Sequence, residues 1–111
     1  MSTNRLIQFS VDKIEQVGPE LYTVGGRCYE GGVTVGDRFD SIVDIQVVRT
    51  VSEYRALAPR HVDAVALSVE KIWFYGQYVR AIDSGHSALL TVKGTGGSKL
   101  KMGHVLQGQK G

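Results

Sequence analysis

The most reactive side chain of the sequence is the thiol of Cys28, the one cysteine among 111 residues. A cysteine nucleophile needs a nearby base, and the histidines of the chain are the candidates. Cys28 has the same parity as Tyr22 and Val24 in an alternating segment, however, and this parity points into a core. Free cysteines are often buried and inert. We therefore assign no catalytic residue. The alternative is a small enzyme that uses Cys28 or a histidine (His61, His86 or His104).

Two motifs have the residue types of known sites without their spacing. Gly94 to Lys99 is rich in glycine and ends in lysine, but it lacks the Gly-x-x-x-x-Gly-Lys pattern of a phosphate-binding loop. Asp83, Ser84 and His86 resemble a hydrolase triad in composition, yet they crowd one turn, whereas a triad is assembled from distant segments. The sequence therefore predicts a glycine-rich hairpin at 94–98 and no bound nucleotide.

The acidic residues form no metal-binding pattern. Asp37, Asp40 and Asp44 do not have the spacing of a calcium loop, and we interpret them as charges at strand edges. The sequence predicts neither a metal nor a cofactor. The formal net charge of +2 is too small to indicate nucleic acid by itself.

Aromatic and basic residues form the remaining candidate site. Arg27 and Tyr29 share one outward face, and Lys71, Trp73 and Tyr75 share another. Aromatic rings beside cations can anchor a protein interface or stack on bases. Alternatively, Trp73 and Tyr75 cover a second small core beneath the segment near 50–60.

The last quarter of the sequence is basic, because Ser84 to Gly111 contains lysines and histidines but no acid. A basic edge can follow a phosphate backbone or dock on an acidic partner. The other interpretation is a solubilising rim of charged edge strands. The lysines that join the candidate partner-binding residues are Lys93, Lys99 and Lys101.

Alternating apolar residues between glycine-containing turns predict strands along most of the chain. The alternation that ends at Val69 resumes with opposite parity at Ile72 and Phe74. One extra residue causes such a change, so we expect a β-bulge near Glu70-Lys71 that turns Trp73 to the opposite face. Residues 50–58 have helical spacing before Pro59 and predict a short helix or ordered loop around 50–60.

Length and composition favour one domain, residues 1–111, with a longer connection at 44–64 and a flexible tail at 107–111. The fold class that follows is all-β, a small closed or nearly closed antiparallel barrel. The N-terminus is too polar for a secretory signal, and no apolar run is long enough to span a bilayer. We expect a cytoplasmic protein that does not bind membranes.

Several blocks of the sequence occur in a familiar order. They are Tyr22-Thr23-Val24-Gly25-Gly26-Arg27, Gly32-Val33-Thr34-Val35-Gly36-Asp37, Val69 to Ile72, Ala81-Ile82-Asp83-Ser84-Gly85, Leu90-Thr91-Val92-Lys93-Gly94 and Leu100 to Leu106. Together they resemble the β-barrel second domain of translational GTPases such as elongation factor Tu, over residues 6 to 108. The resemblance implies a barrel that contacts RNA and neighbouring protein domains. The sequence contains no GTPase domain, and Asp44 to Ala64 is longer than the family's connection, so this segment is expected to carry a specialised contact surface.

These observations favour a stand-alone, non-catalytic binding module that recognises a protein partner, an inhibitor or immunity-type protein being one form of that role. The alternative is an RNA- or ribosome-associated module that uses the basic C-terminal stretch. Exposed strand edges also leave a homodimer open.

Overall fold

Strands account for most of the regular structure in the computed structural model, which describes residues 5–45, 47–49, 54–56 and 60–110. The elements in chain order are β1 (Arg5–Gly18), β2 (Leu21–Glu30), β3 (Val33–Thr34), β4 (Arg38–Asp44), β5 (Val47–Arg49), β6 (Tyr54–Ala56), β7 (Arg60–Phe74), β8 (Gln77–Val79), β9 (Ala81–Ile82), β10 (Ser87–Thr95), the 3₁₀ turn η1 (Gly97–Lys99) and β11 (Val105–Lys110).

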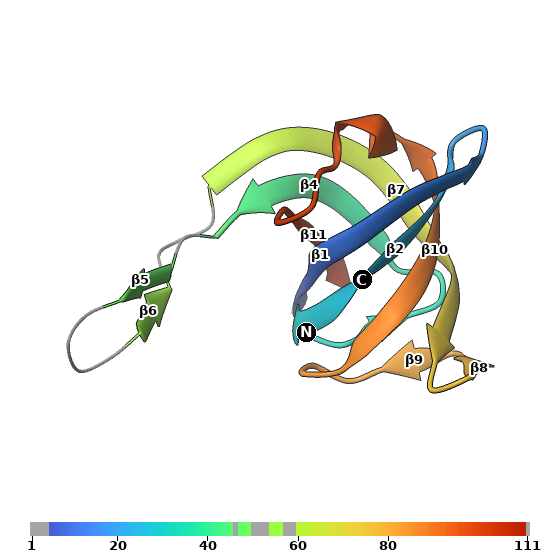
Figure 1. Cartoon of the computed structure of the whole chain (residues 1–111), viewed down its shortest axis with the longest axis horizontal. Helices are drawn as coiled ribbons and strands as arrows, with labels where there is room; N and C mark the ends of the chain where they lie inside the picture. Colours follow the sequence, from blue (N-terminus) through green and yellow to red (C-terminus); the bar gives the residue numbers. More distant parts are fainter. Residues whose placement is uncertain (1–4, 46, 50–53, 57–59, 111) are drawn as a thin grey trace, which may run out of the picture.

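Six strands close into an antiparallel barrel (Figure 1). The sheet runs β10-β2-β1-β11-β4-β7-β8, and β10 also pairs with β7, which closes the ring. β8 extends the sheet outside this ring. The strands β3 and β9 pair separately, and β5 and β6 form a ribbon that lies away from the barrel in Figure 1. The predicted all-β antiparallel barrel is confirmed.

Side chains of the inward parity fill the barrel, as is usual in barrels of this size. The largest of the fully buried side chains are Phe9, Phe39, Ile7, Ile42, Leu67, Ile72, Leu90 and Leu106. Each contributes roughly 1.5–3 kcal/mol through removal of apolar surface from water. The side chain of Cys28 is 0% exposed within this cluster, so its predicted core position is confirmed.

The predicted bulge lies in β7, at Glu70. Thr91 of β10 is opposite Lys71, whereas the next residue, Val92, is opposite Val69, so Glu70 is the extra residue. The alternation of β7 therefore reverses at this point. Ile72 enters the core and Trp73 lies on the outer surface, as the change of parity in the sequence predicts.

Three expectations need correction. Tyr54–Ala56 is a strand paired with β5 and not a helix, because backbone pairing outweighs a weak helical spacing. The rest of the expected helix, 50–53 and 57–59, lies outside the described residues. The flexible tail is wrong for 107–110, which belong to β11 between β1 and β4. The segment 94–98 is no hairpin, since β10 and β11 pair with different strands and η1 stands between them.

Insertion of one alanine between Lys71 and Ile72 should destabilise the barrel by about 3 kcal/mol or more, because Ile72 and Trp73 would exchange faces and the core has no room for an indole. Glu70→Ala keeps the residue count of β7, and as an exposed substitution it should change stability by less than about 0.5 kcal/mol. Urea denaturation of both variants measures the difference. Equal midpoints would contradict the role given to the bulge.

Candidate functional site

One row of side chains crosses the outer face of the barrel and contains two of its exposed aromatic residues, Trp73 and Tyr78. Tyr78 of β8 is opposite Trp73 of β7, and Trp73 is opposite Leu89 of β10. The row continues to Gly25 of β2 and Lys13 of β1. We call Tyr78, Trp73 and Leu89 the aromatic row. Trp73 is 41% exposed and Tyr78 62% exposed, so the row faces solvent.

The rings of the aromatic row hold one another in place. The centroids of Trp73 and Tyr78 are 4.9 Å apart with an angle of 74° between the ring planes, an edge-to-face contact. The Nζ atom of Lys71, two residues before Trp73, lies 5.5 Å from the centroid of the Tyr78 ring. This distance allows a cation–π interaction. The three side chains therefore form one packed group on the outer surface.

The turn between β7 and β8 brings Tyr78 opposite Trp73. Only Tyr75 and Gly76 separate the paired residues Phe74 and Gln77, and both have positive φ, 48° and 79°. Two such angles define a type I′ turn, whose first position favours Asn or Gly over a bulky residue. Tyr75 is 87% exposed in this unfavourable conformation. Its ring lies edge-to-face against that of Phe74, with the centroids 4.4 Å apart.

The structure brings some of the candidate residues of the sequence together and leaves others apart. Lys71 and Trp73 lie together, with Tyr75 at the adjacent turn. Arg27 and Lys93 lie on the same outer face as the row. Arg27 is two residues after Gly25, and Lys93 is four residues after Leu89. Residues an even number apart on a strand share a face. Tyr29 is exposed farther along β2. The idea that Trp73 and Tyr75 cover a second small core is wrong, since both are exposed.

Sequence reasoning did not identify Tyr78 and Leu89 as site residues. The signal for Tyr78 was present in the two-residue connection Tyr75-Gly76, which fixes the hairpin register. Leu89 depends on the pairing of β10 with β7, and no local pattern reveals which strand lies beside another.

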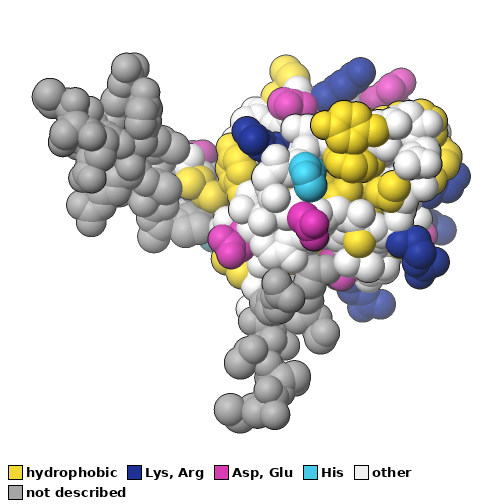
Figure 2. Space-filling view, turned by 90° about the horizontal axis from the view of Figure 1, so that it is seen from below, with side chains coloured by type: hydrophobic (Ala, Val, Ile, Leu, Met, Phe, Trp, Pro, Cys, Tyr) yellow, Lys and Arg dark blue, Asp and Glu magenta, His cyan; other side chains and the backbone are white. Residues whose placement is uncertain are grey.

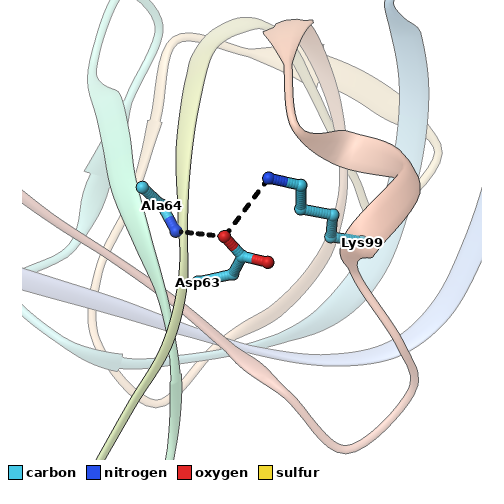
Figure 3. A network of polar contacts seen from close by, with 3 residues as sticks. All are labelled: Asp63, Ala64 and Lys99. Carbon is cyan, nitrogen blue, oxygen red and sulfur yellow. Dashed lines mark hydrogen bonds and ion pairs between the residues drawn. The ribbon is translucent and has the colours of Figure 1, made fainter.

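Lys99 belongs to a different part of the surface and is already paired. Figure 3 shows the Asp63 carboxylate between β7 and η1. Its Oδ1 atom accepts hydrogen bonds from the Ala64 backbone N–H at 2.9 Å and from Lys99 Nζ at 3.2 Å. The Ala64 hydrogen bond first, and then the Lys99 ammonium, lower the pKa of Asp63 below 3.8. Lys99 therefore helps to join η1 to β7.

The basic C-terminal stretch does not form one continuous surface. Lys93 lies on the outer face of β10, and Lys99 is bonded to Asp63. Lys101 is exposed in the loop before β11, where its backbone N–H donates to Nδ1 of His104 at 3.2 Å. The three predicted lysines thus lie in three different surroundings.

Other kinds of site are not apparent in the described part of the chain. No three side chains of His, Cys, Asp or Glu gather there as metal ligands. A shallow, open hollow of about 450 Å³ lies beside Gly31 and Asp83, away from the aromatic row. Among the residues that the structure describes, none forms a helix with the length and hydropathy to cross a membrane.

Comparison with known proteins identifies the fold. Two solved structures of translation elongation factor SelB from Methanococcus maripaludis, one without ligand and one with the GTP analogue GppNHp, each match 92% of this chain with a TM-score of 0.64. The fold is that of a translation-factor barrel. The sequence identity is 15%, and the chain spans 18% of the SelB chain, so the likeness shows the fold alone. No family model and no curated protein matches the sequence.

Asp63→Asn should lower the melting temperature slightly at neutral pH, and this difference should disappear in acid. The folded state lowers the pKa of Asp63, so its stabilisation is present above 3.8 and is lost as the pH falls through the lower folded value. Thermal unfolding of both proteins from neutral to acidic pH measures it. Lys99→Met should reproduce part of the difference, since the Ala64 hydrogen bond remains. A difference that is independent of pH would contradict this account.

Tyr75→Asn should stabilise the protein by about 0.5–1 kcal/mol, because Asn tolerates the left-handed conformation that the turn requires. Tyr78→Asn, in a strand position of the same hairpin, is the matched control and should not stabilise. Denaturant unfolding distinguishes the two. A loss of stability in Tyr75→Asn would show that the Tyr75 ring supports the fold.

Proposed function

We propose that the barrel is a non-catalytic binding module that recognises a protein partner through the aromatic row. The observation that carries this proposal is the exposed, mutually packed pair of Trp73 and Tyr78 on the outer sheet. Trp and Tyr are the side chains most enriched among the energetically dominant residues of protein interfaces. A pair that is already ordered loses little conformational entropy when a partner covers it.

The surroundings of Cys28 support a non-catalytic role. Its side chain is buried, and its Sγ atom donates to the carbonyl oxygen of Glu30 at 3.5 Å. A thiol that is closed off from solvent cannot meet a substrate without opening of the barrel. Recognition through the outer surface requires no such opening.

The placement of the C-terminal lysines gives no support to an RNA-binding surface built from that stretch. Binding to a nucleic-acid backbone gains its free energy from several cations that neutralise phosphates together. Here Lys99 is bonded to Asp63, and Lys101 lies in a loop on a different part of the surface from Lys93. An inhibitor or immunity-type protein in the cytoplasm is one form that this role could take.

The test replaces Tyr78 with the photo-crosslinking residue p-benzoylphenylalanine and captures proteins from a lysate of the source cells. We expect one predominant crosslinked protein. In a pull-down without the crosslinking residue, Trp73→Ala and Tyr78→Ala should each capture at least about tenfold less of this partner than the unsubstituted chain. Truncation of a central aromatic anchor costs about 2 kcal/mol or more. Both substitutions are at exposed positions, so circular dichroism should show a folded barrel.

Met102→Ala is the matched control, because Met102 is also exposed and apolar but lies in the loop before β11. Its capture should equal that of the unsubstituted chain. Capture that is unchanged in Trp73→Ala and Tyr78→Ala contradicts the proposal. Capture that nuclease treatment abolishes favours the RNA alternative.

A further inference from the structure

Cations lie on both sides of the aromatic row. Lys71 precedes Trp73 by two residues on β7, and Arg27 follows Gly25 by two residues on β2. Residues two apart on a strand share a face, so both cations emerge beside the row, one before it and one after it. Lys93 adds a further positive charge on β10, on the same side as Lys71. Figure 2 shows exposed hydrophobic side chains gathered on one side of the barrel, with Lys and Arg as well as Asp and Glu side chains at their edge.

These cations are not neutralised within the described part of the protein. The ion pairs there join Arg60 to Asp44 and Lys99 to Asp63, and neither involves the cations beside the row. The Arg27 Nε atom donates to the carbonyl oxygen of Gly85 at 3.1 Å, which orients the guanidinium. Its terminal nitrogens remain available for a carboxylate, and an ammonium such as that of Lys71 has three donors.

The acidic residues of this side of the barrel are at its border. Glu15 is on β1, beyond Gly25, and Glu70 is the extra residue of the bulge. The Asp12 carboxylate reaches the Gly25 end of the row, where its Oδ1 atom and Leu89 Cδ1 each lie 3.6 Å from the position that a Cβ on Gly25 would take. Trp73 and Tyr78 lie on the other side of Leu89 from this carboxylate. A partner that places a carboxylate on each side of an apolar side chain matches this order of charges.

We infer that the aromatic row binds an extended acidic segment of the partner protein, in which an apolar residue is flanked by acidic residues two positions before and after it; this inference rests on the proposed function. In an extended chain such residues share a face, and the first and last are about 13 Å apart. That length covers the four residues of strand between the level of Lys71 and the level of Arg27, and the long side chains span the two strand spacings, about 10 Å, that separate β7 from β2. The apolar side chain packs against Trp73 and Leu89, and the carboxylates face the two cations.

The probe is a synthetic peptide with the sequence Gly-Glu-Ser-Leu-Ser-Glu-Gly, capped at both ends. Trp73 is the one tryptophan of the chain, so its fluorescence reports on the site directly. We expect a saturable change in Trp73 emission at low ionic strength, with an affinity that falls at least about fivefold when salt is raised from about 50 to about 300 mM. The peptide with Gln in place of both Glu residues should bind at least about tenfold more weakly.

Charge reversal identifies the residues that are responsible. Lys71→Glu and Arg27→Glu should each weaken the acidic peptide at least about tenfold. Lys101→Glu makes the same change of charge in the loop before β11 and should leave binding unchanged. Equal binding of the Glu and Gln peptides, an equal effect of Lys101→Glu, or no change in Trp73 emission would each overturn the inference.

Two further outcomes separate this inference from other partners and from the proposed function. Stronger quenching of Trp73 by an oligouridylate than by the peptide, or a dimer in sedimentation that Trp73→Ala dissociates, would overturn it in favour of RNA or of a second copy. If the crosslinked partner depends on Trp73 and Tyr78 but not on Lys71 or Arg27, the inference is wrong and the proposed function stands. If capture is independent of Trp73 and Tyr78, the proposed function is wrong.

Discussion

The extra residue at Glu70 is the constraint on which both the core and the candidate site depend. Before it, the inward residues of β7 are Val65, Leu67 and Val69, and after it they are Ile72 and Phe74. Strict alternation would carry the parity of Val69 on to Lys71 and Trp73, and would place an ammonium and an indole in the interior. The bulge instead sends both outward, where they meet Tyr78. The bulge at one residue of β7 therefore has two effects: apolar side chains fill the interior, and Trp73 lies on the outer surface.

Close contact between backbones makes this barrel narrow and leaves its interior to its own side chains. A Cβ atom on Gly26, Gly94 or Gly108 would overlap the carbonyl oxygen of the neighbouring strand, that of Ser10, Ala66 or Arg38 respectively. Glycine at these positions lets strands approach where the sheet bends most. The enclosed space is then filled by side chains such as Phe9 and Phe39. A ligand has no room inside, so the chemistry that remains available is that of the outer side chains.

Local patterns in the sequence predicted the parts of the fold that depend on local geometry. Alternation alone placed Cys28 in the core, turned Trp73 outward and located the bulge. The misplaced parts depend on which strand lies beside another. Residues 107–110 look like a tail in sequence and become a strand because β1 and β4 offer edges on both sides. The lysines form one basic stretch in sequence, and the barrel distributes them. Within the aromatic row, the alternation of the sequence predicted Trp73, and the two-residue hairpin turn is enough to predict Tyr78. Leu89 joins the row only because β10 pairs with β7 in the closed sheet.

The hairpin of β7 and β8 carries more exposed aromatic surface than the fold needs. Ile72 and Phe74 attach it to the core from the inner face, which is sufficient to hold a short hairpin on a barrel. Trp73 and Tyr78 meanwhile leave apolar area in water, which loses about 25 cal/mol for each Å² that could have been buried. Tyr75 adds the cost of an unfavourable backbone conformation. Under the proposed function, a partner that covers the rings recovers these losses. The cations on both sides would then fix how that partner lies across the rings, because like charges in the wrong register are repelled.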